Sequence, residues 1–124
     1  MTLQEAIDRI DSLKPNQYTA EDKVRWLSDL DMNIFRDVIL SHHHRRDIKP
    51  FMGYTMEDLE HSLIAEDPYT ELYVAYLGMK MDEYNGDTAK YNNSSVMFNA
   101  YMENYSKWIN KTRRPYNRGN FRIW

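Results

Sequence analysis

Residues 67–109 read DPYTELYVAYLGMKMDEYNGDTAKYNNSSVMFNAYMENYSKWI, and they hold seven of the chain's ten tyrosines. Apolar and aromatic side chains recur there at three- and four-residue spacing on both sides of Asn85 and Gly86, a pair that is typical of a helix end. This pattern predicts two consecutive amphipathic helices, and so short a joint favours an antiparallel hairpin. Because no nucleophile or metal motif accompanies the tyrosines, they indicate a surface for packing and assembly rather than an active site.

The ends of these two helices carry recognisable signals. We expect Asp67 to be the N-cap of the first helix, with Pro68 at the first helical position, where its missing N–H is harmless. Gly86 should end that helix and Asp87 should cap the next one. The periodic pattern stops after Lys111.

Two further helices are predicted in the first third of the chain. Thr2 and Glu5 form a capping-box pattern for a short helix that ends before Pro15. Thr19 should cap a second helix, which runs from Ala20 to about Ser41. Its apolar positions recur every three or four residues, at Val24, Leu27, Leu30, Ile34, Phe35 and Val38.

Between residues 42 and 66 the periodic pattern disappears, and we expect an extended connection with a short helical turn between Met56 and Leu63. Connections of this length are usually functional or flexible. The sequence therefore predicts an all-α fold of about four helices, with a C-terminal helical hairpin, a long middle loop and an extended basic C-terminal arm. Residues 1–111 should form a single helical domain and residues 112–124 the arm.

Composition excludes several classes of protein. Without cysteine, the chain cannot form disulfides, use a thiolate nucleophile or hold zinc through cysteine. No apolar run is long enough to cross a membrane, and the N-terminal sequence is unlike a signal peptide. The sequence also lacks a phosphate-binding loop, a dinucleotide fingerprint, a GxSxG elbow and an HExxH helix. We therefore expect no enzymatic activity and no cofactor.

Histidines and carboxylates could in principle bind a metal or perform acid–base chemistry. His42, His43 and His44, with Asp47 and His61, are candidate ligands, but adjacent histidines on an extended chain point alternately whereas zinc requires converging ligands. A polar, solvent-exposed loop is the favoured interpretation. The carboxylate pairs are explained by capping and by the helix dipole. We expect no metal site.

Asp31 is the exception among the carboxylates, because it lies close to the apolar face of the second helix. A carboxylate there needs a partner, and an arginine or an N-terminal amide is expected. Trp26, on the same helix, should belong to the core or to an interface.

Charge is distributed unevenly along the chain. Residues 107–124 contain six basic and no acidic side chains, whereas the remaining residues contain 10 basic and 19 acidic ones. The basic and aromatic arm residues are candidates for contact with a partner: Arg113, Arg114, Tyr116, Arg118, Phe121, Arg122 and Trp124. Three interpretations stay open for this arm: docking on a protein, a solvated tail, and stacking and phosphate contact with single-stranded nucleic acid.

Four segments of the sequence, taken together, resemble one known family. They are residues 3–31, which contain KVRWLSDLD, the MGY of residues 52–54, residues 63–105, which contain PYTELY and YNN, and the RRP of residues 113–115. In these segments the chain resembles the head–tail connector proteins (neck adaptor or head completion proteins) of long-tailed bacteriophages and prophages. The triple histidine and the terminal FRIW are not part of the resemblance.

The resemblance implies a non-enzymatic structural subunit of the phage neck. Such a subunit would form a ring of about a dozen copies, either alone or only on the portal, and would join the portal of the DNA-filled head to the tail. Its partners would be the portal protein, the tail-side neck proteins and the DNA that passes through the channel without sequence specificity. It would act in the virion, after assembly in the host cytoplasm, and without a membrane.

Specific residues can be assigned to these expected contacts. Partner contacts are expected from the loop 42–56, including His43, His44 and Arg45, and from the arm. Core or inter-helix contacts are expected from Trp26, Tyr69, Tyr73, Tyr76, Phe98 and Tyr101. The alternative function is a small nucleic-acid-binding accessory protein that acts through its basic arm. A third possibility is a small enzyme or a metal-dependent regulator whose histidine loop becomes ordered on binding metal.

Overall fold

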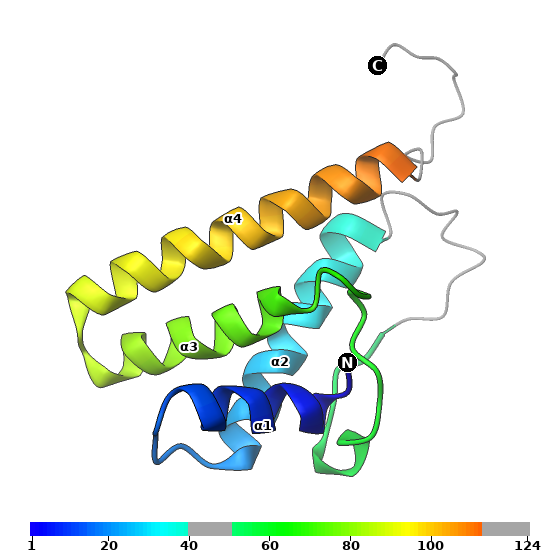
Figure 1. Ribbon diagram of the computed structural model, residues 1–124. Coiled ribbons are helices and arrows are strands. Elements are labelled where there is room, and N and C mark those ends of the chain that lie inside the picture. Colours follow the sequence, from blue (N-terminus) through cyan, green and yellow to red (C-terminus); the bar gives the residue numbers. More distant parts are fainter. Residues whose placement is uncertain (40–50, 113–124) are drawn as a thin grey trace.

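The computed structural model describes residues 1–39 and 51–112 (Figure 1). Its α-helices are α1 (Leu3–Leu13), α2 (Ala20–Ile34), α3 (Glu71–Asn85) and α4 (Thr88–Thr112). A π-helical turn, η1 (Phe35–Ile39), follows α2, and a 3₁₀ turn, η4 (Met56–Asp58), precedes α3. Within the described residues, extended backbone pairs only at one isolated bridge, between Thr2 and Ser62. The prediction of an all-α fold with about four helices is confirmed.

Most residues predicted to contact partners lie outside the described part of the chain. They are His43, His44 and Arg45 of the middle loop, and Arg113, Arg114, Tyr116, Arg118, Phe121, Arg122 and Trp124 of the arm. The structure therefore bears on the helical body, and the roles of these residues stay predictions.

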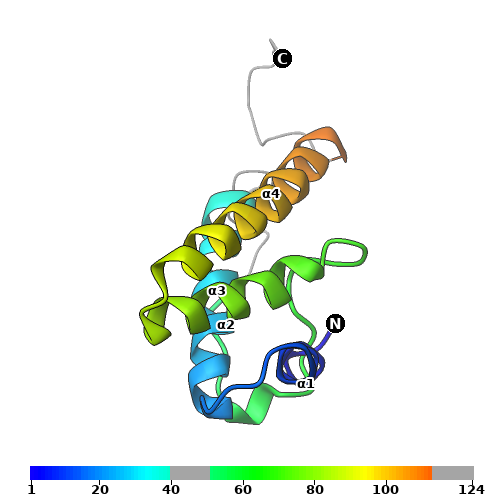
Figure 2. The same ribbon diagram turned by 60° about the vertical axis from the view of Figure 1, so that its left-hand side comes forward.

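The helices pack around a single core. Figures 1 and 2 show α4 antiparallel to α3, α1 on the other side of α3, and α2 running across α1 and α3. The predicted helical hairpin is therefore present, formed by α3 and α4. The largest fully buried apolar side chains come from all four helices: Leu3, Leu27, Ile34, Leu72, Tyr73, Leu77, Met81, Tyr105 and Ile109.

The start of α1 is completed by residues far along the chain. The predicted capping box is present, because the Thr2 hydroxyl accepts from the Glu5 N–H (3.1 Å) and the Glu5 carboxylate accepts from the Thr2 N–H (2.8 Å). The next two donors of the first turn reach the segment 59–63, where Leu3 N–H donates to His61 O (3.1 Å) and Gln4 N–H to Leu59 O (2.9 Å). Because free N–H groups at a helix start need acceptors, this segment is tied to α1.

The joint of the hairpin follows the expected chemistry. Gly86 ends α3 with a φ of 75°, in the left-handed region where a side chain is unfavourable. The Asp87 carboxylate accepts from the Lys90 N–H (3.1 Å), so that it caps the first turn of α4.

One predicted helix boundary is wrong, and another lies outside the described residues. The third helix begins at Glu71 rather than at Asp67, because the preceding residues form a tight turn in which Tyr69 N–H donates to Glu66 O (2.8 Å). Asp67, whose peptide bond to Pro68 is cis, accepts from the Thr70 hydroxyl (2.9 Å) and does not cap a helix. The second helix was expected to continue to about residue 41. Its α-helical part ends at Ile34, the wider helical turn η1 continues it to Ile39, and the predicted end lies outside the described residues.

A buried carboxylate joins three helices. Asp82 of α3 is only 2% exposed and accepts hydrogen bonds from Lys14, at the end of α1, and from Ser94 of α4. Burial acts to raise the pKa of the Asp82 carboxyl, but the bonds from Lys14 and Ser94 outweigh it and hold the pKa below its usual value. The carboxylate therefore stabilises the packing of α1 and α4 on α3 as long as it is ionised.

An Asp82→Asn variant should be less stable than the wild type by about 1–3 kcal/mol at pH 7, because it loses a charge-assisted bond to Lys14. A carboxyl whose pKa is lowered by folding contributes stability above its unfolded pKa of about 4 and loses it as pH falls through the folded pKa. The difference between the two proteins should thus be constant from pH 7 to about pH 5 and shrink below about pH 4. Urea unfolding at several pH values measures it.

The matched control is Asp8→Asn on α1, an exposed aspartate that accepts from the Gln4 side chain (2.8 Å). It should change stability by less than about 0.5 kcal/mol at any pH. A stability difference for Asp82→Asn that does not depend on pH would contradict the role assigned to its charge.

Candidate functional site: two exposed apolar surfaces

Three exposed methionines lie on α2 and on the part of the middle connection that runs beside it. Met52 is 84% exposed, and Met32 and Met56 are each 42% exposed. We call these three residues the methionine patch. Gly53 keeps the connection close to α2, because a Cβ there would lie 2.5 Å from the Ser28 Oγ and 3.3 Å from the Met32 Sδ. Its φ of 92° also disfavours any side chain.

Asp31 holds the same connection from inside the molecule. Its carboxylate is fully buried and accepts from the Tyr54 hydroxyl, from the Tyr73 hydroxyl (2.6 Å) and from the Ile64 N–H (3.0 Å). The Tyr73 hydroxyl in turn accepts from the Ala65 N–H (2.7 Å). The prediction that Asp31 pairs with an arginine or an N-terminal amide is therefore wrong. Two tyrosines and a backbone amide take the place of such a partner, and they join α2, α3 and the segment 54–65.

Burial raises the pKa of the Asp31 carboxyl above its usual value, although the bonds from Tyr54, Tyr73 and Ile64 act in the opposite direction. A carboxyl with a raised pKa contributes stability below its unfolded pKa and loses it as pH rises through the folded value. Burial and the nearby Asp31 charge also raise the pKa of both tyrosine hydroxyls, so these stay protonated and act as donors.

The second surface is the side of α4 that faces away from α3. Residues 91–102 of α4 contain no charged side chain, and yet half of them are exposed. Val96 is 67% exposed and Met97 is 56% exposed. We define the outer face of α4 as the exposed residues Ala89, Asn92, Asn93, Val96, Met97, Asn99 and Ala100. A solvent-facing helix surface normally carries charges, so this face is unusual.

The aromatic residues singled out in the sequence lie mostly on the inward side. Trp26 is buried and stacks on Tyr84, with 5.6 Å between ring centroids. Tyr76 meets Phe98 at 5.0 Å across the hairpin. Of the remaining residues, Tyr73 is buried, and Tyr69 and Tyr101 are half-buried against the core. These residues build the molecule itself and leave the outer face of α4 to smaller side chains.

Sequence reasoning missed the exposed methionines and the outer face of α4. The uncharged run of residues 91–102 was visible in the sequence, but its exposure depends on α4 packing mainly against α3 among the described elements. Met32 and Met52 are brought together by the return of the connection to α2, which no local pattern reports.

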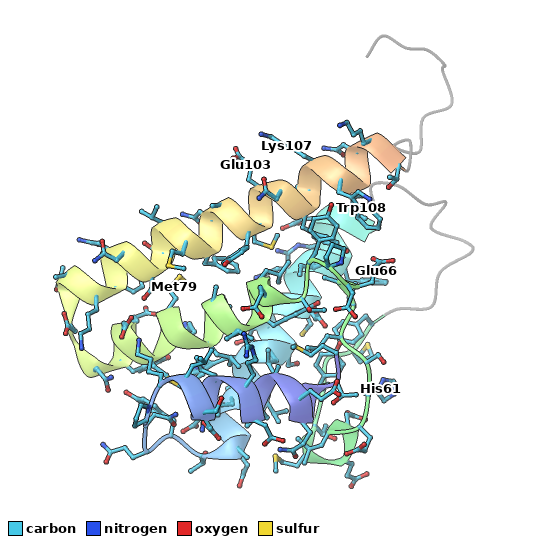
Figure 3. The ribbon with its side chains drawn as sticks, in the orientation of Figure 1. His61, Glu66, Met79, Glu103, Lys107 and Trp108 are labelled. Atoms are coloured by element: carbon cyan, nitrogen blue, oxygen red, sulfur yellow. The ribbon has the colours of Figure 1, made fainter. Side chains whose placement is uncertain are left out.

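The far end of α4 has a different chemistry. Figure 3 shows Glu103 and Lys107 on the upper side of α4, and Trp108 on the side that faces α3. The Trp108 ring lies 5.0 Å from that of Tyr69, and an open hollow beside them is lined also by Asn104, Lys107, Asn110 and Lys111. The hollow thus offers amines, amides and aromatic rings.

Among the described residues, no group of three or more histidines, cysteines or acidic residues could hold a metal ion. His61 is exposed, at the edge of the connection in Figure 3, with its ring 6.4 Å from that of Tyr54. No helix of the described residues is both long and apolar enough to cross a bilayer.

Tyr73→Phe should destabilise the protein by about 2–3 kcal/mol, because it removes a donor to buried Asp31 and the acceptor of the Ala65 N–H. Urea unfolding at pH 7 measures the loss. The control is Tyr76→Phe, one turn along α3, where the ring packs on Phe98 and a change below about 0.5 kcal/mol is expected. Equal stability of the two variants would show that the Tyr73 hydroxyl makes no net contribution to the free energy of unfolding.

Comparisons with protein-family models, with curated proteins and with solved structures find no match for this chain. The role of the two surfaces must therefore be inferred from their own residues.

Proposed function

We propose that this chain is a non-enzymatic structural subunit that works by assembling with other protein chains. The observation that carries the proposal is the uncharged, exposed outer face of α4. The central part of protein interfaces is distinguished from ordinary surface by its depletion of charged side chains. Exposed apolar residues at two separate places fit a protein that contacts neighbours on two sides.

Within that role, we favour the ring-forming adaptor of a phage neck, joining the portal of the DNA-filled head to the tail. The sequence resemblance to head–tail connector proteins supports this choice. Several residues of its motifs have structural roles: Trp26 and Leu27 are buried, Asp31 centres the network described above, and the Lys23 amine, also buried, pairs with Asp11 at 2.7 Å. The resemblance thus concerns residues that determine the fold, and the function follows by analogy.

The net negative charge of residues 1–106 fits a subunit that lines the channel through which DNA passes. Residues 1–106 carry nine more acidic than basic side chains. A surface with this charge repels phosphates and would allow DNA to pass without being held. Lys107 and Lys111, in the last turns of α4, are exposed and available for protein contacts.

Native mass spectrometry of the purified chain at high concentration and moderate salt tests the proposal. We expect a discrete large oligomer, on the order of a dozen copies, because a heterologous contact that closes by rotation gives a ring. A chain that stays monomeric at every concentration would count against self-assembly as its function.

Truncation after Arg114 separates assembly from folding. Because the removed residues follow the end of α4, the variant should keep the helical circular dichroism and thermal transition of the full chain while its oligomer weakens. Full assembly by the truncated chain would contradict a role for the arm. DNA binding that is lost on truncation, and that falls steeply with salt in the full chain, would instead favour the nucleic-acid-binding alternative.

A further inference from the structure

The two exposed apolar surfaces lie on different sides of the molecule. In Figures 1 and 2, α4 lies at one end and the segment 51–58, which carries Met52 and Met56, lies toward the other. A contact between two copies that uses the same surface twice would cover one patch and leave the other in water. A contact that uses both surfaces covers both patches at once, and it is heterologous.

The shapes and flexibilities of the side chains suit each other. Apart from Met97, the outer face of α4 is built from alanines, asparagines and Val96, which are short side chains that allow a neighbouring surface to approach the helix closely. The methionine patch offers three long, flexible side chains, and methionine fills irregular gaps well.

Acidic side chains follow the methionine patch, whereas basic side chains predominate beyond the outer face of α4. Glu57 and Glu60 follow Met56 and are exposed. On α4, the exposed residues Lys107 and Lys111 extend the outer face toward the end of the helix, and Glu103 is the one acidic side chain between Tyr91 and Thr112. Complementary charge at the rim steers two surfaces together and disfavours pairs of like surfaces.

We propose that the outer face of α4 in one copy docks on the methionine patch of a second copy of the same chain. This inference rests on the proposed function as an assembling subunit, and it identifies the two surfaces that meet. Each copy then presents one surface of each kind, so that the contact repeats from copy to copy.

The absence of cysteine from the natural sequence makes a direct test possible. Single variants Met97→Cys and Met52→Cys are purified, mixed in equal amounts and oxidised under mild conditions. The mixed disulfide-linked dimer should exceed either self-linked dimer several-fold, because the two positions face each other only between copies. The control is Leu13→Cys, at an apolar residue of α1 that is also 57% exposed. Mixed with either variant, it should give only background cross-linking.

The outcomes separate this inference from the proposed function. A dominant self-linked Met97→Cys dimer would show that α4 faces α4, and background yield in every mixture would show that neither surface meets another copy. Either result overturns the docking arrangement. If native mass spectrometry still shows a discrete oligomer, the proposed function stands with a different interface. If the chain is also monomeric, both fail.

Discussion

The buried Asp31 carboxylate is the constraint on which the arrangement of this protein depends. A carboxylate removed from water is tolerated only where donors surround it, and its donors come from Tyr54, Ile64 and Tyr73. The second helix therefore reaches its place only when the middle connection and the third helix are also in place. The Tyr54 N–H also donates to the Ser28 hydroxyl of α2 (2.9 Å). This bond holds the neighbouring Gly53 and Met52 close to α2.

The periodicity of apolar residues was sufficient to predict the helices, and Gly86 with Asp87 was sufficient to place the hairpin joint. These signals are local, since each depends on neighbours within one or two turns. The partners of Asp31 lie 23 and 42 residues away in Tyr54 and Tyr73, and one of them belongs to a segment without periodicity. No local pattern could connect them. The predicted start of α3 was wrong for a related reason. The Asp67 carboxylate could accept either from backbone N–H groups, as a helix cap, or from the Thr70 hydroxyl, and in the folded turn it accepts from Thr70.

The fourth helix shows how a sequence rich in aromatic residues can be misread as an interaction surface. Its rings, such as Phe98 and Tyr105, pack inward against α3 and the core, whereas the residues left to solvent around Val96 carry no charge. Aromatic content thus located the hairpin, and lack of charge located the candidate interface. The aromatic residues and the uncharged exposed residues alternate along the same stretch of sequence. They are distinguished only by which of them face α3 when α4 packs.

The bonds from Leu3 and Gln4 to the carbonyls of His61 and Leu59 have a consequence for the order of folding during synthesis. The first helix emerges from the ribosome early, but the acceptors for its first turn appear only when some sixty residues have been made. The α3–α4 hairpin needs contacts that are closer along the chain. We therefore expect the segment made first to be among the last to reach its final state. Until then, its apolar side would stay exposed to other chains on the same messenger.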